Sequence, residues 1–157
     1  MIPTAEIRSL KVFEALPDAV TEAFCADAEA LEFSAGDDIL HQHDQAHSLY
    51  ILLSGTVEFL IKVEGVDDLF VGMSSERGAL LGWSIVREPH RYTATIKCAE
   101  PCRVLKLPRR VVARVLADDP RAGYAFRQTI AAAVANRLRD ALGLLGGIPK
   151  SGPRPEL

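Results

Sequence analysis

The sequence predicts a mainly β domain with flanking helices: a double-stranded β-helix, or jelly-roll-like β-roll, with N-terminal helices and a long C-terminal helix. Residues 31–107 alternate apolar and polar side chains with period two, and glycine-containing turns interrupt the alternation. Residues 1–30 and 108–145 instead place apolar side chains at helical spacing. Short strands joined by glycine turns are typical of rolls, so we expect one domain over 1–145 and a flexible tail over 146–157.

Two helices are expected before the first strand. Residues 5–16 carry Ile7 and Phe13 on one helical face, which predicts a short first helix. Pro17 opens a second helix that continues to about Ala30, because proline suits the first turn of a helix.

The strands follow from the alternation of apolar residues. It is clearest over 57–63, and residues 49–53 form the preceding strand, with Gly55 in the turn between them. Over residues 39–43 the alternation places Ile39, His41 and His43 on one face of a strand. Further strands are expected at 31–34, 69–73, 93–98 and 103–107.

Residues 82–86 interrupt the strands, and we expect one helical turn there, followed by a loop over 87–91. Helix returns at Pro108, and the run Asp118-Asp119-Pro120 ends it and caps the last helix, 121–145. The apolar stripe of this helix is Phe126, Ile130, Val134, Leu138, Ala141 and Leu145. Such a stripe favours a homodimer through 121–145, with packing against the helix's own roll as the alternative.

The composition limits the partners. The net charge of −3 provides no basic field for nucleic acid or anionic lipid. No apolar run approaches the ~20 residues of a membrane span, and the N-terminus lacks a secretory pattern. Three cysteines, an odd number, indicate free thiols in a reducing compartment. We therefore expect a cytoplasmic protein without a membrane partner.

Two motifs identify a family. Residues 33–37 read Phe-Ser-Ala-Gly-Asp, and residues 44–57 read Asp-Gln-Ala-His-Ser-Leu-Tyr-Ile-Leu-Leu-Ser-Gly-Thr-Val. In order and spacing they resemble the cyclic nucleotide-binding domain, the sensor domain of catabolite activator protein and FNR-type regulators. The resemblance implies a stand-alone sensor or regulatory domain that is not an enzyme and needs no cofactor. Its implied ligand is a cyclic nucleotide, cAMP or cGMP, and it would signal through its C-terminal helices to an unknown protein partner.

The resemblance also implies a site, a phosphate-binding cassette in which an acid follows a glycine and an arginine precedes the returning strand. Here Gly82 keeps the glycine, Trp83 stands at the acid position and Tyr92 at the arginine position, with Arg91 one residue away. We therefore expect a cyclic nucleotide bound unconventionally, or another small ligand. The predicted ligand-binding residues are Leu81, Gly82, Trp83, Ser84, Arg91, Tyr92, Thr93 and Ala94.

Two other interpretations remain open. His41, His43 and His47 have the spacing of a metal-binding motif of cupins, which suggests a cupin-like metal-dependent enzyme as the alternative to a metal-free protein. The other is a ligand-free dimerisation module. The residues after 145 are too few for a helix-turn-helix, so no DNA-binding domain is expected.

Overall fold

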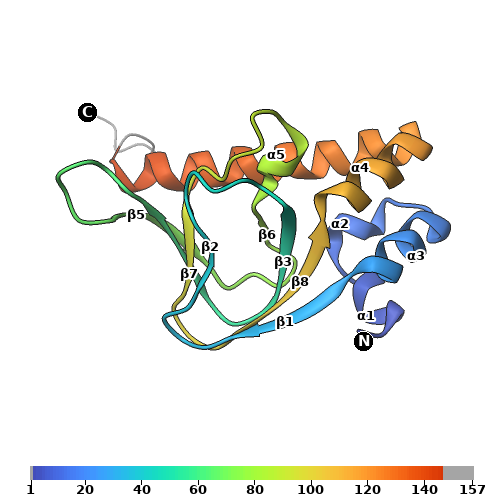
Figure 1. Cartoon of the computed structure of the whole chain (residues 1–157), viewed down its shortest axis with the longest axis horizontal. Helices are drawn as coiled ribbons and strands as arrows, with labels where there is room; N and C mark the ends of the chain where they lie inside the picture. Colours follow the sequence, from blue (N-terminus) through green and yellow to red (C-terminus); the bar gives the residue numbers. More distant parts are fainter. Residues whose placement is uncertain (1, 147–157) are drawn as a thin grey trace, which may run out of the picture.

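The computed structural model describes residues 2–146 and confirms the predicted fold class, a β-roll flanked by helices (Figure 1). The predicted tail lies, from residue 147 onward, outside the described residues. None of the helices described is long and apolar enough to cross a membrane.

Three short helices precede the roll: α1 (Thr4–Arg8), α2 (Lys11–Glu14) and α3 (Asp18–Asp27). The single helix predicted over 5–16 is wrong, because Leu10 is extended and separates α1 from α2. This break lets Leu10, Val12 and Phe13 all be buried, whereas neighbouring residues on one helix point about 100° apart. Helix α3 begins after Pro17 as predicted but ends at Asp27. Ala30 lies instead in the first strand, opposite Leu105.

The roll consists of two antiparallel four-stranded sheets. The first has the order β1-β8-β3-β6 and the second β2-β7-β4-β5. Their bounds are β1 Glu29–Phe33, β2 Asp38–Leu40, β3 Ser48–Ser54, β4 Val57–Ile61, β5 Leu69–Ser74, β6 Leu80–Leu81, β7 Thr95–Cys98 and β8 Cys102–Pro108. Successive strands mostly change sheet, so the chain winds around a shared interior (Figure 1).

The strand predicted over 39–43 is shorter than expected. Strand β2 ends at Leu40, and the backbone of His43 adopts a positive φ of 72°. The turn is held across the roll, because the amide of Gln42 donates to the Thr95 hydroxyl and that of His43 to the Tyr92 carbonyl. His41 and His43 therefore do not share a strand face.

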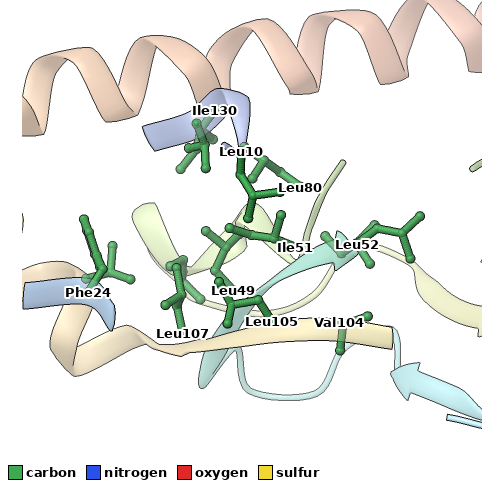
Figure 2. Packing of buried hydrophobic residues seen from close by; sticks show 14 of the residues in the cluster. Leu10, Phe24, Leu49, Ile51, Leu52, Leu80, Val104, Leu105, Leu107 and Ile130 are labelled. Carbon is green, nitrogen blue, oxygen red and sulfur yellow. The ribbon is translucent and has the colours of Figure 1, made fainter. Parts of the chain in front are cut away.

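The core extends on both sides of the first sheet. In β3, Ile51 and Leu52 are both buried although they point to opposite faces. Figure 2 shows Leu10 and Ile130 gathered with Leu80 above Ile51. One face of the sheet thus lines the roll, and the other packs beneath the helices.

Two helices follow the roll: α4 (Arg109–Asp118) and α5 (Pro120–Leu144). Asp119 caps α5 as predicted, its carboxylate accepting from the amides of Arg121 and Ala122 at 3.1 and 3.0 Å. In Figure 1, α5 extends along the whole length of the roll. The N-terminal half of α5 is anchored in the core by Phe126 and Ile130.

Candidate functional site

The helical turn predicted at 82–86 is present as the 3₁₀ helix η1 (Trp83–Val86), which begins directly after Gly82. Gly82 has a φ of 77°, a conformation that other residues rarely adopt. A Cβ atom here would lie 2.8 Å from the Tyr92 ring and 3.3 Å from the Ser48 carbonyl oxygen. The turn therefore requires glycine, and it presses the start of the cassette against Tyr92.

Tyr92, at the position where the resemblance implies arginine, joins the two ends of the cassette to the roll. Its side chain is buried, with 6% of the residue exposed. The hydroxyl donates to the carbonyl oxygen of Ser48 at 2.8 Å and accepts from the Ser48 amide at 3.3 Å. These two bonds satisfy the hydroxyl within the protein, so Tyr92 ties this end of the cassette to β3 and offers no free donor.

We expect Tyr92 to make the protein sensitive to alkali. Burial raises the pKa of Tyr92 from 10.0 to about 12, so above pH 10 the unfolded chain loses this proton first. The free energy of unfolding should fall between pH 10 and 12, by up to about 2–3 kcal/mol from this group. Urea unfolding of Tyr92→Phe over this range should show a shallower fall than the wild type. Burial also raises the pKa of Cys98 to about 12, so some of the fall should persist.

The matched control is Tyr124→Phe, at an exposed position on α5. It should keep the wild-type pH profile. A Tyr92→Phe protein whose stability falls as steeply as that of the wild type would contradict the assignment.

Six of the eight predicted ligand-binding residues surround one small cavity of about 20 Å³. Its lining is Gly82, Trp83, Ser84, Tyr92, Thr93 and Ala94, with Leu40, Phe59 and Ile96 from the roll. Such a volume holds about one water molecule. A nucleotide therefore does not fit inside the roll in this conformation.

The other two predicted residues lie apart from the cavity. Leu81 is fully buried in β6 and belongs to the core. Arg91 is exposed, and its Nη1 donates to the carbonyl oxygen of His43 at 2.8 Å. Arg91, the arginine nearest in sequence to the expected arginine position, is thus hydrogen-bonded to the backbone of the 41–44 turn.

A second, larger hollow of about 450 Å³ lies between α5, the β5–β6 connection and α2. We call it the α5 groove; its walls include Val12, Glu76, Trp83, Ala133, Asn136 and Arg137. Trp83 lines both this groove and the small cavity. After Ile130, small or polar residues of α5 such as Ala133 and Asn136 line this hollow.

Beyond Ile130 the predicted apolar stripe of α5 does not pack on the roll, which was the alternative to pairing with a second copy. Val134 and Leu138 are exposed, while Arg137 turns toward the roll. Only 18% of the Arg137 side chain is exposed, and its Cζ lies 3.5 Å from the centroid of the Phe59 ring. The cation is stabilised by this aromatic face, which faces it from β4.

The histidine cluster is not formed. Among residues 2–146, no group of three or more His, Cys, Asp or Glu side chains is arranged to hold a metal. The Nε2 atom of His41 instead lies 3.1 Å from Asp38 Oδ2, and its Nδ1 atom lies 3.6 Å from Asp44 Oδ2. The geometry therefore gives no support to a cupin-like site at His41, His43 and His47.

The family model described as the cyclic nucleotide-binding domain matches residues 30–119, more than half of the chain. The chain belongs to the cyclic nucleotide-binding domain family. The resemblance inferred from residues 33–37 and 44–57 is confirmed.

Solved structures of this family share the fold. A cyclic nucleotide-binding protein from Geobacter metallireducens is 25% identical, with a TM-score of 0.78 over 88% of this chain and 99% of that chain. The sensor domain of the transcriptional regulator DNR from Pseudomonas aeruginosa is 18% identical, with a TM-score of 0.69 over 83% and 91%. The regulatory domain of Toxoplasma gondii PKA, solved with cAMP, is 15% identical, with a TM-score of 0.72 over 84% and 48%. No curated protein matches the sequence.

Proposed function

We propose that this cyclic nucleotide-binding domain is a cytoplasmic regulatory sensor and not an enzyme. Its ligand is a cyclic nucleotide bound unconventionally or another small molecule, and binding is transmitted through the C-terminal helices to a protein partner. The observation that carries the proposal is the position of Trp83, which lines both the closed cavity of the roll and the α5 groove.

The coupling follows from what Trp83 contacts. A ligand that entered beside Gly82 would displace Trp83, since the cavity of about 20 Å³ leaves no free volume. Moving Trp83 changes the wall against which α5 rests. A ligand that prefers one position of Trp83 would therefore shift the population of α5 positions.

Titration with cAMP and cGMP tests this function. Trp83 is the only tryptophan, so its fluorescence reports directly on the cassette. We expect saturable binding of one nucleotide by calorimetry, with a matching fluorescence change and altered amide exchange in α5. In Trp83→Ala, amide exchange in α5 should no longer respond to the nucleotide, because the side chain that joins the cassette to the α5 groove is absent. Saturable binding without any change in α5 would contradict the signalling role, and no binding of either nucleotide would exclude both as ligands.

We also propose that the domain forms a homodimer through residues 121–145. Leu138 is 59% exposed, and Val134, Leu142 and Leu145 are exposed beside it. At about 100° per residue, Leu138 and Leu142 project from the side of α5 opposite to the groove residue Ala133. An apolar stripe of this kind favours pairing with a second copy, since it leaves the groove side free for ligand.

Leu138→Glu should convert the dimer into a monomer. Two carboxylates placed in an apolar helix pair would be desolvated, so dimer affinity should fall about 100-fold or more. Sedimentation equilibrium measures the change. The control is Leu144→Glu, which is equally exposed on the same helix but lies off the stripe. A wild-type protein that sediments as a monomer at high concentration would contradict the homodimer.

A further inference from the structure

We propose that the α5 groove binds a small organic anion, with Arg137 holding its carboxylate or phosphate and Trp83 packing against its flat apolar part. The inference rests on the proposed sensor function and names the class of its ligand. It moves the cation of the site from the cassette, where the resemblance implies it, to the long helix.

Arg137 is prepared for a ligand by its surroundings. The centroid of the Phe59 ring of β4 lies 3.5 Å from the guanidinium carbon, and the ring covers one side of the group. The Nε atom is buried and has no hydrogen-bond partner among the described residues. A buried donor without a partner is unfavourable, so a shift of the guanidinium that brings Nε–H to an acceptor in the groove would be favoured.

The ion pair that Arg137 makes is weak. Its Nη1 lies 3.9 Å from Asp140 Oδ2, and the Asp140 side chain is 61% exposed. An exposed carboxylate at this distance contributes little. Because the guanidinium presents a planar fork of donors, a carboxylate or phosphate would bind to it by two parallel hydrogen bonds.

The cassette residues at and beside the expected arginine position do not offer a cation to the anion. Tyr92 occupies the expected arginine position and is satisfied by Ser48, and Arg91 is bound to the backbone of His43. Phe59 lines the small cavity while its ring also faces Arg137. Arg137 therefore lies next to the site that the family resemblance implies. The Phe59 ring contacts both the small cavity and the Arg137 guanidinium, which lines the α5 groove.

The other groove residues refine the ligand class. A volume of about 450 Å³ suits a small molecule rather than a peptide or a nucleic acid. Lys11 adds a second cation to the groove lining, and Glu76 and Asp140 add negative charge, so a ligand that carries hydroxyl or amino donors beside its anionic group fits better than a bare anion. Trp83 supplies an apolar face for a flat ring.

Matched anionic and neutral probes test the inference by NMR on the ¹⁵N-labelled protein. We use 4-hydroxybenzoate against 4-hydroxybenzamide, and cAMP against adenosine. Each anion should bind with millimolar or lower Kd and shift the Nε–H resonance of Arg137 and the indole N–H of Trp83. The neutral analogues should bind about tenfold more weakly or not at all. This readout needs no variant, so it holds even where a substitution impairs folding.

Arg137→Gln should weaken anion binding by about 10- to 100-fold, with Arg137→Lys intermediate, because lysine keeps the charge but loses the fork. Arg139→Gln, on the same helix, is the control and should bind like the wild type. Equal binding by Arg137→Gln and Arg139→Gln, or equal binding of acid and amide, would overturn the anion site but leave ligand sensing intact. Absence of binding by every anion would overturn the site itself, while amide exchange in α5 upon ligand addition separately tests the sensor function.

Discussion

Replacing Phe126 with alanine should lower the free energy of unfolding by about 3–5 kcal/mol. Phe126 is fully buried, and its ring stacks on Phe24 with centroids 5.5 Å apart. Phe24 in turn packs on Phe13, at 5.6 Å. These three rings join α5 to α3 and α2, so truncating the last of them leaves a cavity where the helices meet and removes its aromatic contacts.

The effect should extend to the position of α5 because Phe126 anchors the N-terminal half of that helix. Urea unfolding followed by far-UV circular dichroism measures the loss, and amide exchange should rise along α5. Phe70→Ala on β5 is the control, since the residue is 41% exposed; it should cost less than about 1 kcal/mol. Equal losses for the two variants would show that the aromatic cluster is not what fastens α5.

The fold class was predictable because the period of the apolar residues changes twice, from helical to alternating and back. The boundaries of individual helices and strands could not be predicted where a long-range contact decides them. The 41–44 turn is held by Thr95 and Tyr92, about fifty residues away, and no local pattern announces those bonds. Leu52 alternates as an outward residue, yet it is fully buried, because the tertiary fold covers both faces of this sheet.

The candidate site was predictable only in part, for a related reason. Gly82 and Trp83 follow from the register of the family motif, and the structure places both beside Tyr92. Arg137 could not be inferred, because helical periodicity names faces without saying which of them meets the roll. The leucines that continue the stripe after Ile130 suggest an inner face, yet they point outward and Arg137 points inward. A helix with one face for the roll and another for a second copy carries two stripes, and the more apolar one need not be the buried one.

The corner between β3 and β4 should be the least tolerant position of the roll: Gly55→Ala should lower the free energy of unfolding by about 3 kcal/mol or more. Gly55 has a φ of 94°, and an added Cβ would lie 2.5 Å from the carbonyl oxygen of Pro101 and 2.9 Å from Cys102 Cα. These are backbone atoms, so no side-chain rotation relieves the contact. The corner also passes the chain from one sheet to the other, and the bond from the Ala99 amide to the Thr56 carbonyl, at 2.9 Å, would be strained with it.

Gly36→Ala separates the two causes of this loss. Gly36 has nearly the same φ, 90°, but an added Cβ meets nothing within 4 Å. Alanine at position 36 should therefore lose only the conformational term, about 1–2 kcal/mol. The difference between the two variants in urea unfolding isolates the contact between the β3–β4 and β7–β8 turns. Equal losses would mean that the corner accommodates the added Cβ atom without strain. The two sheets could then separate at the end of the roll where this corner joins them.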